Sequence, residues 1–466
     1  MAQPILIIQM QRMGDLILTF PLFLWLKREY PDHPIWVVAE PRFFKPLLSL
    51  SPPVNYCPPS AEKQLLKEKY FLVLNLSHRS EAASLAGKLK AEHKSGLLEY
   101  EGKGFYIQGK WQLYRASLVQ NNRYNAFHWA ELNALDSISL KTISNTVWPK
   151  PRILKDNPKK VGVFLGASEP EKRPSRAFWV AFCEALLKKG HRPILLGGKN
   201  ELQLAREIKK NSKYPLLNLC ARFELSELGM IGQTLDILVA ADTGPMHLAT
   251  WTGVRVANLS MGPVSPWDTG PYHPGNYVFR AALSCVDCWE CLGKDNLCHA
   301  KFKPGKMAFL IDGLLKEKFK NNSSLNPAGI RLLKTRRNNL GLFSLDQQGK
   351  NCNYNVHLLF RFFWAQVWAY RFQLGDRKNV QGCWQDIVEK YPQIAIYFKQ
   401  SLFDFMLNFR NDFKTGNVKF ELWKSRPSFL RPLTGYLELF IQNEDMDNRA
   451  FNQAFNFMEE LFSIVS

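Results

Sequence analysis

The sequence predicts an α/β protein of two similar halves that face a cleft, followed by a mainly helical extension. Three observations lead to this fold class. Short apolar runs alternate with amphipathic segments up to about residue 325, a proline-containing segment without apolar periodicity interrupts them at 144–151, and the pattern changes beyond residue 326. Because strands that alternate with helices are typical of βαβ units, each half is expected to be Rossmann-like. We therefore predict domains at 1–150, 151–325 and 326–466.

Short apolar runs mark the strands of both halves. They are Ile5–Gln9, Ile35–Ala39, Phe71–Leu76, Val161–Leu165, Pro193–Leu196, Ile237–Ala240 and Val254–Leu259. Segments with helix-like patterning separate them, as at Leu16–Glu29, Phe178–Lys189 and Glu201–Lys210. Such an alternation favours buried strands in two mainly parallel sheets.

The region beyond residue 326 is rich in aromatic side chains. Of the 146 residues from 321 to 466, 26 are aromatic, which is a larger share than the 13% of the whole chain. Apolar residues recur there at helical spacing, as at Leu359, Phe363 and Val367, and the strand pattern is absent. We predict a mainly helical extension of unknown role. Its join to the second half carries basic residues that are expected to be exposed: Arg331, Lys334, Arg336 and Arg337.

One segment of the extension, Phe360–Phe372, has two interpretations. Arg361 and Arg371 lie among its aromatic residues, so the segment could rest on a membrane surface. Alternatively, its aromatic side chains form the core of a helical bundle. No residue of the extension is predicted to be catalytic.

The chain is basic, with 61 Lys and Arg against 41 Asp and Glu and a formal net charge of +20. The excess is concentrated in residues 151–200 and 301–350. Clustered positive charge favours an anionic partner such as a phosphorylated small molecule, nucleic acid or an acidic membrane surface. Nucleic acid ranks last among these partners, since the sequence contains no recognisable nucleic-acid-binding module.

Several features predict a cytoplasmic protein. No uncharged stretch reaches the roughly 18 residues that a membrane-spanning helix needs. The run Ile5–Ile8 has no basic lead-in and soon meets Arg12, which indicates a strand rather than a signal peptide. The 9 cysteines are an odd number and argue against a disulfide framework.

Asp15 follows the first predicted strand, next to Gly14. Ligands of open parallel sheets bind beyond the carboxyl ends of the strands, so Asp15 is expected to face the cleft. A carboxylate at that position can accept a proton from a hydroxyl nucleophile. Alternatively, Asp15 only satisfies N–H groups in the first turn of the following helix.

Two glycine-containing turns follow strands of the second half. Gly166-Ala167-Ser168, with Lys172 and Arg173, could cradle a phosphate through backbone N–H groups and a hydroxyl. The alternative is a solvated basic loop. Gly197-Gly198 follows the next strand, and Glu201 is suitably spaced to bind a ribose hydroxyl, although this second signal is weak.

The segment Asp242-Thr243-Gly244-Pro245-Met246-His247 is the strongest constellation. It follows a predicted strand and precedes a helix-like segment. Its carboxylate and hydroxyl can bind sugar hydroxyls, and its backbone N–H groups can bind phosphate at the helix start. A capping role for Asp242 or Thr243 is an alternative, but it does not explain the whole segment.

These motifs resemble those of the heptosyltransferases, glycosyltransferase family 9 of the GT-B fold. Met13-Gly14-Asp15 and Pro21 resemble the first motif of that family. Residues 242–249, then Gly262-Pro263 and Gly270-Pro271-Tyr272, resemble its donor-site signature. The resemblance spans about residues 4–320 and leaves the C-terminal extension out.

The resemblance implies a role for each matching residue. Asp15 would be the general base, and Lys172 would stabilise the leaving diphosphate. The substrate-binding positions that the resemblance implies are Gly14, Ser168, Glu201, Phe223, Leu225, Asp242, Thr243, Gly244 and His247. Among these, Glu201 would bind ribose, the backbone of Phe223 and Leu225 would contact adenine, and Asp242 would hold sugar hydroxyls. Ala167 stands where some relatives have another hydroxyl.

The implied reaction is inverting transfer of L-glycero-D-manno-heptose from ADP-heptose to the inner core of lipopolysaccharide. No metal cofactor is expected to be required. The implied partners are the ADP-heptose donor, a lipid A–core acceptor and the cytoplasmic face of the inner membrane. The alternatives are a family 9 enzyme with another nucleotide sugar or glycan acceptor, and a nucleotide-sugar-binding protein without catalysis.

A cysteine cluster lies beyond the donor-site signature. It consists of Cys285, Cys288, Cys291 and Cys298, followed by His299. Thiolates at this spacing can bind a structural zinc ion, although the spacing fits no standard iron–sulfur motif. The alternative is a set of reduced thiols with a structural role.

Overall fold

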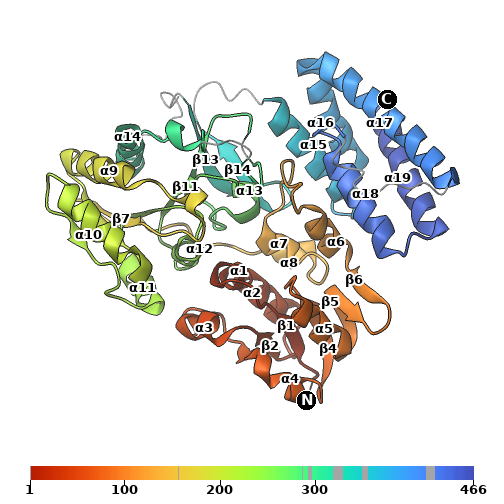
Figure 1. Cartoon of the computed structure of the whole chain (residues 1–466), viewed down its shortest axis with the longest axis horizontal. Coiled ribbons are helices and arrows are strands. Elements are labelled where there is room, and N and C mark those ends of the chain that lie inside the picture. The colour runs from red at the N-terminus through yellow and green to blue at the C-terminus, as the bar shows by residue number, and fades with distance from the viewer. Residues whose placement is uncertain are drawn as a thin grey trace.

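We describe the protein from a computed structural model, which covers residues 2–155, 157–285, 287–291, 296–317, 329–348, 355–415 and 426–466. Two Rossmann-like halves lie side by side, and a bundle of helices packs at one end of them (Figure 1). This arrangement confirms the predicted α/β fold class with a helical C-terminal region.

The N-terminal half is a six-stranded sheet of order β3-β2-β1-β4-β5-β6. All neighbours are parallel except β5 and β6 at one edge. The strands are β1 Ile5–Ile8, β2 Ile35–Val38, β3 Asn55–Cys57, β4 Lys69–Asn75, β5 Lys90–Tyr100 and β6 Gly104–Gln108. The helices are α1 Met13–Leu18, α2 Phe20–Glu29, α3 Pro41–Phe44, α4 Glu62–Leu65, α5 Ser80–Lys88, α6 Lys110–Ser117, α7 Trp129–Leu132 and α8 Leu140–Ser144. Every residue of β1 is buried, as its apolar run predicted.

The second half is an eight-stranded sheet of order β14-β13-β12-β11-β10-β7-β8-β9. Its strands are β7 Lys160–Phe164, β8 Arg192–Leu196, β9 Leu217–Asn218, β10 Ile237–Ala240, β11 Val256–Ser260, β12 Tyr277–Ala281, β13 Ile330–Arg337 and β14 Phe343–Gln347. Its helices are α9 Arg176–Lys188, α10 Leu202–Asn211, α11 Leu225–Gly232, α12 Gly244–Trp251, α13 Pro266–Thr269 and α14 Pro304–Leu315. The strand order reverses between β7 and β10, as it does between β1 and β4 in the first sheet.

The last helices form a bundle whose core is aromatic. They are α15 Val356–Arg371, α16 Arg377–Lys390, α17 Pro392–Thr415, α18 Arg431–Asn443 and α19 Asn448–Val465. Asn355, Asp376 and Asp447 cap three of them, each side chain accepting a backbone N–H of the first turn. Trp364 and Trp368 of α15 are fully buried. Segment 360–372 is therefore bundle core, and its alternative placement on a membrane surface is wrong.

The start of the predicted third domain needs correction. Residues 330–347 are not helical, because β13 and β14 extend the second sheet in antiparallel register next to β12. The join is also not uniformly exposed, since Arg337 is half-buried against Glu131 of the first half. Periodicity missed these strands because basic residues occupy several positions of β13. The domain limits themselves stay a prediction.

One of the hydrophobic clusters connects the parts of the molecule. It joins Trp25 of the first half, Phe343 of the second sheet and Trp364 of the bundle. The predicted linker contributes to this core, because Trp148 is buried in edge contact with Trp25. The halves are thus packed against each other and not merely tethered.

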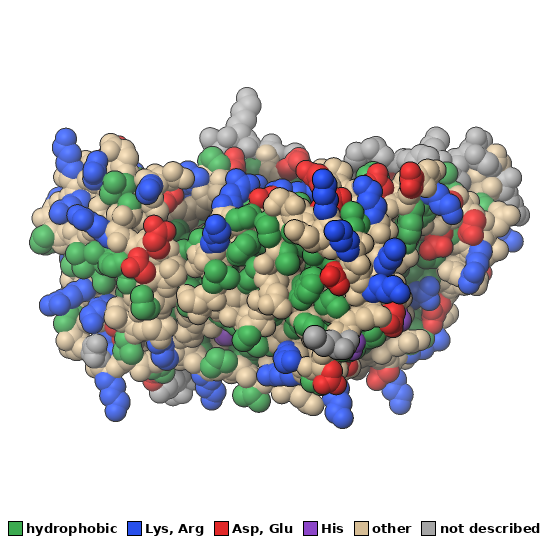
Figure 2. Space-filling model, turned by 90° about the horizontal axis from the view of Figure 1, so that it is seen from below, with side chains coloured by type: hydrophobic (Ala, Val, Ile, Leu, Met, Phe, Trp, Pro, Cys, Tyr) green, Lys and Arg blue, Asp and Glu red, His purple; other side chains and the backbone are tan. Residues whose placement is uncertain are grey.

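None of the helices in the described residues is long and apolar enough to cross a membrane. On the face in Figure 2, Lys and Arg side chains are spread over the whole width with Asp and Glu among them. Membrane association and a cytoplasmic location stay predictions.

Candidate functional site

A large cleft opens between the two sheets, with a volume of about 1380 Å³. In each sheet the strand order reverses between two parallel strands, and ligands of such sheets bind beyond the carboxyl ends at that point. Asp15 and His78 follow β1 and β4, whereas Ser168 and Asp242 follow β7 and β10. All four residues line the cleft. The topology therefore brings together side chains that are far apart in the sequence.

Asp15 lies in the first turn of α1, beyond the carboxyl end of β1. Its Oδ2 atom accepts the backbone N–H of Arg12 over 3.2 Å. Asp15 thus satisfies a backbone N–H group at the helix start, as the alternative interpretation of this residue predicted. Because Asp15 is half-buried and lines the cleft, the capping contact does not prevent it from meeting a ligand.

Helices α1 and α12 approach each other closely across the cleft, as Figure 1 shows. A Cβ atom at Gly14 would lie 3.6 Å from His247 Cδ2 and 3.7 Å from Gly244 Cα. A side-chain atom at position 14 would thus make only ordinary van der Waals contact, so the two helix starts lie close together without a steric need for glycine there. As a result, the first motif of the chain lies beside the Asp242–His247 segment.

The segment around Asp242 is held by contacts from several elements. Asp242 Oδ2 accepts a hydrogen bond from Thr269 Oγ1 over 3.2 Å and lies 3.7 Å from Lys172 Nζ. Thr243 is the N-cap of α12, but its side chain makes no capping hydrogen bond. The Thr243 hydroxyl therefore does not cap α12, although capping was the alternative interpretation of this residue. The start of α12 keeps backbone N–H groups that can bind an anion.

His247 is buried on the first turns of α12. Burial lowers its pKa, and Lys172 acts in the same direction, while Asp242 and Asp15 oppose the shift. The imidazole is therefore neutral at pH 7. A neutral His247 can donate a hydrogen bond to a phosphate oxygen without adding a full charge.

A chain of charged groups crosses the cleft from one half to the other. Glu169 accepts from Arg12 Nη1 over 3.0 Å and lies 3.3 Å from Lys172 Nζ. Partial burial alone would raise the pKa of Glu169, but Lys172 and Arg12 together lower it. The two cations are therefore grouped around one anion in the cleft, at a position that a diphosphate could share.

The residues expected to bind the nucleotide follow β7, β8 and β9, at one end of the second sheet. Ser168, Glu201, Phe223 and Leu225 all border the cleft. Glu201 Oε2 accepts the backbone N–H of Gly198 over 2.8 Å, which fixes the carboxylate beside the glycine turn. The structure thus gathers every predicted substrate-binding residue in one cleft.

Several cleft residues were not predicted from the sequence. They are Arg12, His78, Asn122, Trp129, Glu169, Asp268, Trp289 and Glu290. His78 could have been found, because it follows β4 at the switch point of the first sheet. Asn122 and Trp129 carry no such signal, since they come from the irregular segment around α7.

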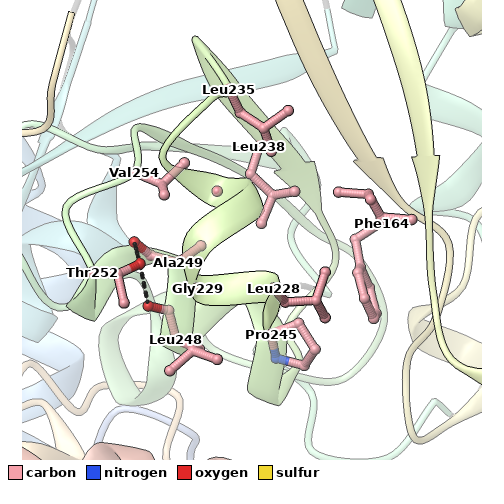
Figure 3. A pocket seen from close by; sticks show the side chains of 12 residues that line it. Phe164, Leu228, Gly229, Leu235, Leu238, Pro245, Leu248, Ala249, Thr252 and Val254 are labelled. Carbon is pink, nitrogen blue, oxygen red and sulfur yellow. Dashed lines mark hydrogen bonds between the residues drawn. The ribbon is translucent and has the colours of Figure 1, made fainter. Parts of the chain in front are cut away.

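A small apolar cavity of about 20 Å³ lies behind the cleft (Figure 3). Leu228 of α11 and Pro245 of α12 border both spaces, and Leu235 and Val254 close the far side. The cavity is too small for a sugar or a base. It marks the hydrophobic packing that supports α12 from the side away from the cleft.

Zinc binding at the four cysteines of the cluster stays a prediction. Cys285, Cys288 and Cys291 are exposed, and Cys298 is half-buried. Among the residues that the structure describes, no group of three or more His, Cys, Asp or Glu side chains is arranged to hold a metal ion. His299 contacts the backbone carbonyl of Glu171 at 2.6 Å. The zinc prediction gains no support from this geometry.

Asp268 of α13 is buried at the edge of the cleft between the two halves. It accepts hydrogen bonds from the side-chain amides of Asn122 and Asn125, the latter over 2.7 Å. Burial raises its pKa to about 7 in spite of these amides, and Asp287 adds to the shift while Arg361 opposes it.

We expect this carboxyl group to make folding stability depend on pH. A folded-state pKa raised from 3.8 to about 7 means that only the folded protein keeps the proton between these values. The contribution of Asp268 to the free energy of unfolding is complete below pH 4. It falls by at most about 1.4 kcal/mol per pH unit as the pH rises towards 7. Urea unfolding of wild type and Asp268→Asn over this range measures it. Equal slopes for the two proteins would contradict the prediction.

Two mainly parallel sheets with facing switch points define the class of GT-B proteins, in which a ligand binds between two Rossmann-like halves. A model of glycosyltransferase family 9, the heptosyltransferase family, matches residues 60–296. The chain belongs to this family.

Comparison with individual proteins agrees with this assignment. The chain is 27% identical over 164 residues to lipooligosaccharide heptosyltransferase 2 of Campylobacter jejuni, covering 34% of this chain and 52% of that protein. It is 24% identical to lipooligosaccharide heptosyltransferase 2 of Haemophilus ducreyi, covering 59% of this chain and 88% of that protein. The chain thus spans about half the length of the curated Campylobacter relatives that it matches.

A solved structure shows the same fold. The structure of E. coli ADP-heptose LPS heptosyltransferase II superposes with a TM-score of 0.51 at 20% sequence identity. The match covers 68% of this chain and 99% of that one. At this identity the likeness establishes the fold alone.

Proposed function

We propose that this protein is an inverting glycosyltransferase that moves L-glycero-D-manno-heptose from ADP-heptose to the inner core of lipopolysaccharide. The observation that carries the proposal is the single cleft that Asp15, Lys172 and the segment Asp242–His247 share. Family membership supports heptosyl transfer. The similar E. coli protein is named for ADP-heptose and lipopolysaccharide, which supports the choice of substrates.

In the proposed reaction Asp15 is the general base. Its carboxylate takes the proton of an acceptor hydroxyl while that oxygen forms a bond to the anomeric carbon of the heptose. The bond from this carbon to the diphosphate oxygen breaks at the same time, and ADP leaves with the electron pair. Because the attack comes from the face opposite ADP, the anomeric configuration inverts.

The second half would bind the donor and stabilise the leaving group. Lys172 and the backbone N–H groups at the start of α12 offset the negative charge that develops on ADP. Asp242 would hold sugar hydroxyls, Glu201 the ribose, and the backbone of Phe223 the adenine. These groups can act without a metal ion, so we expect turnover to persist in EDTA.

The proposed acceptor is a lipid A–core oligosaccharide at the cytoplasmic face of the inner membrane. The basic residues of the chain favour a phosphorylated, membrane-bound acceptor of this kind. A different nucleotide sugar or glycan remains the first alternative, because none of these contacts reads the stereochemistry of a sugar.

The test is turnover of ADP-heptose by the purified protein on truncated lipopolysaccharide acceptors, with release of ADP as the readout. UDP- and GDP-sugars serve as competing donors. Preference for ADP-heptose supports the proposal, whereas turnover with another donor alone favours the first alternative. Donor binding without turnover on any acceptor would identify a non-catalytic binding protein.

We expect Lys172→Ala to weaken ADP affinity by roughly 10-fold or more, because a charge-assisted contact to phosphate contributes about 1.5–3 kcal/mol. Lys188→Ala is the matched control, since it removes one positive charge from the exposed face of α9, outside the cleft. Calorimetric titration with ADP measures both variants. Equal affinities for the wild type and Lys172→Ala would refute the role of Lys172.

A further inference from the structure

The C-terminal bundle touches both Rossmann-like halves through one buried side chain of α15. Arg361 Nη2 lies 2.7 Å from Asp287 Oδ2 of the second half and also donates to the backbone carbonyl of Arg123 in the first half. The Arg361 Cζ atom lies 5.1 Å from the ring centroid of Trp267 in α13. A part of the chain beyond the family match therefore reaches the junction beside the cleft.

Asp287 belongs to a loop with an unusual backbone. Asp287 and Trp289 both have positive φ, at 60° and 57°, a region that is strained for residues other than glycine. Such conformations persist only where the surroundings hold them. Here Arg280 and Arg361 hold Asp287 from two sides, at 3.2 Å and 2.7 Å.

The charge on Asp287 agrees with this role. Burial alone would raise its pKa, but the two arginines outweigh that effect and lower it. The buried carboxylate is thus ionised and bound to both guanidinium groups. Removal of either arginine would leave the buried Asp287 carboxylate with only one of these two guanidinium partners.

Two of the segments that Arg361 contacts form a wall of the cleft. Loop 287–290 contributes Trp289 and Glu290 to the lining, and α13 contributes Thr269. Thr269 in turn donates to Asp242 Oδ2 over 3.2 Å. Arg361 is therefore connected through α13 to the carboxylate that is proposed to hold the sugar.

We propose that Arg361 is a positioning residue for the transfer reaction, and that the helical bundle supports the wall of the cleft that recognises the transferred sugar. The inference rests on the proposed function. An indole ring packs against the C–H groups of a sugar, and a carboxylate accepts its hydroxyl hydrogens, so Trp289 and Glu290 suit a sugar better than a diphosphate. The residues proposed to contact the nucleotide follow β7, β8 and β9, at the end of the second sheet away from β12.

The test compares Arg361→Gln with Arg371→Gln. Arg371 lies on the same helix but is exposed, and its Cζ atom is 4.8 Å from the Phe457 ring centroid. We expect Arg361→Gln to lower kcat/KM for ADP-heptose by roughly 10- to 100-fold, because misplaced substrate contacts cost about that much. ADP affinity should be unchanged, since the residues proposed to contact the nucleotide follow β7, β8 and β9, whereas loop 287–290 follows β12. Arg371→Gln should lower the melting temperature without this kinetic effect.

Two further variants separate positioning from stability. Trp289→Ala should reproduce the loss in kcat/KM although it leaves the bundle intact. Arg361→Lys should recover part of the loss, because a lysine keeps the charge near Asp287 but lacks the planar fork that contacts several partners. A lower melting temperature for Arg361→Gln with kcat/KM equal to wild type would overturn the inference.

Hydrogen exchange of the amides in loop 287–290 provides a readout without substrate. The loop should exchange faster in Arg361→Gln than in wild type and Arg371→Gln. Unchanged exchange would also overturn the inference. Absence of turnover by the wild type would instead refute the proposed function, while the exchange data still decide whether Arg361 holds the loop.

Discussion

Asp15→Ala is expected to lose about 10²- to 10⁴-fold in kcat while the protein keeps its fold and its affinity for ADP-heptose. A hydroxyl is a weak nucleophile until a base removes its proton, and this range is what a positioned general base contributes. Asp15 lies at the switch point of the first sheet, directly beside the start of α12. Single-turnover kinetics with saturating acceptor would measure the chemical step.

Asp15→Asn is the sharper variant, because Asp15 also accepts the backbone N–H of Arg12. An asparagine oxygen can keep that capping contact but cannot take the proton. The asparagine variant should therefore retain the melting temperature of the wild type and lose as much turnover as Asp15→Ala. Wild-type turnover by either variant would eliminate Asp15 as the base.

Arg337→Met is expected to reduce the free energy of unfolding by about 3–5 kcal/mol, because it leaves a buried carboxylate without its cation. Glu131 of α7 is fully buried, and its Oε1 atom lies 3.0 Å from Arg337 Nη1. The same oxygen accepts hydrogen bonds from the Tyr272 hydroxyl and the Phe343 amide. Urea unfolding followed by circular dichroism would measure the loss.

The loss should grow as the pH rises. Burial raises the pKa of Glu131, and Arg337 is the largest influence that lowers it. Without Arg337, folding favours the protonated acid more strongly. The variant should therefore differ least from wild type at pH 5, where Glu131 can hold its proton, and most at pH 8.

Arg336→Met is the matched control on the same strand. Its guanidinium pairs with Asp346 over 2.7 Å, but the Arg336 side chain is 53% exposed, whereas that of Arg337 is 17% exposed. Exposed pairs contribute about 0–1 kcal/mol, so this variant should be near wild type. Adding Glu131→Gln to Arg337→Met should restore part of the stability, because glutamine needs no counter-charge. Similar losses for both arginine variants would contradict the prediction.

The candidate site was predictable to the extent that it follows strand ends. Asp15, Ser168 and Asp242 each come shortly after an apolar run, so the rule for parallel sheets places them at a cleft from their sequence positions alone. The same rule would have found His78. Residues from irregular segments, such as Asn122 and Glu290, do not come directly after a strand and have no periodic signal.

The strands beyond residue 326 were missed for a related reason. β13 lies between β14 and β12 in the second sheet and carries basic residues such as Arg331 and Lys334 among its apolar ones. Antiparallel strands need not be apolar on both faces, so a search for continuous apolar runs passes over them. The burial of Arg337 depends on Glu131, which lies some two hundred residues earlier in the chain.

By itself, the sequence determined the alternation of strands and helices, the two Rossmann-like halves and the motifs at their strand ends, because these are local patterns of apolar spacing and turn chemistry. Only the tertiary structure decided which side chains share a space. Three contacts join residues that are distant in sequence. They are the packing of α1 against α12, the ion pair of Glu169 with Arg12, and the ion pair of Arg361 with Asp287. Such contacts depend on how the halves and the bundle pack, which no local pattern encodes.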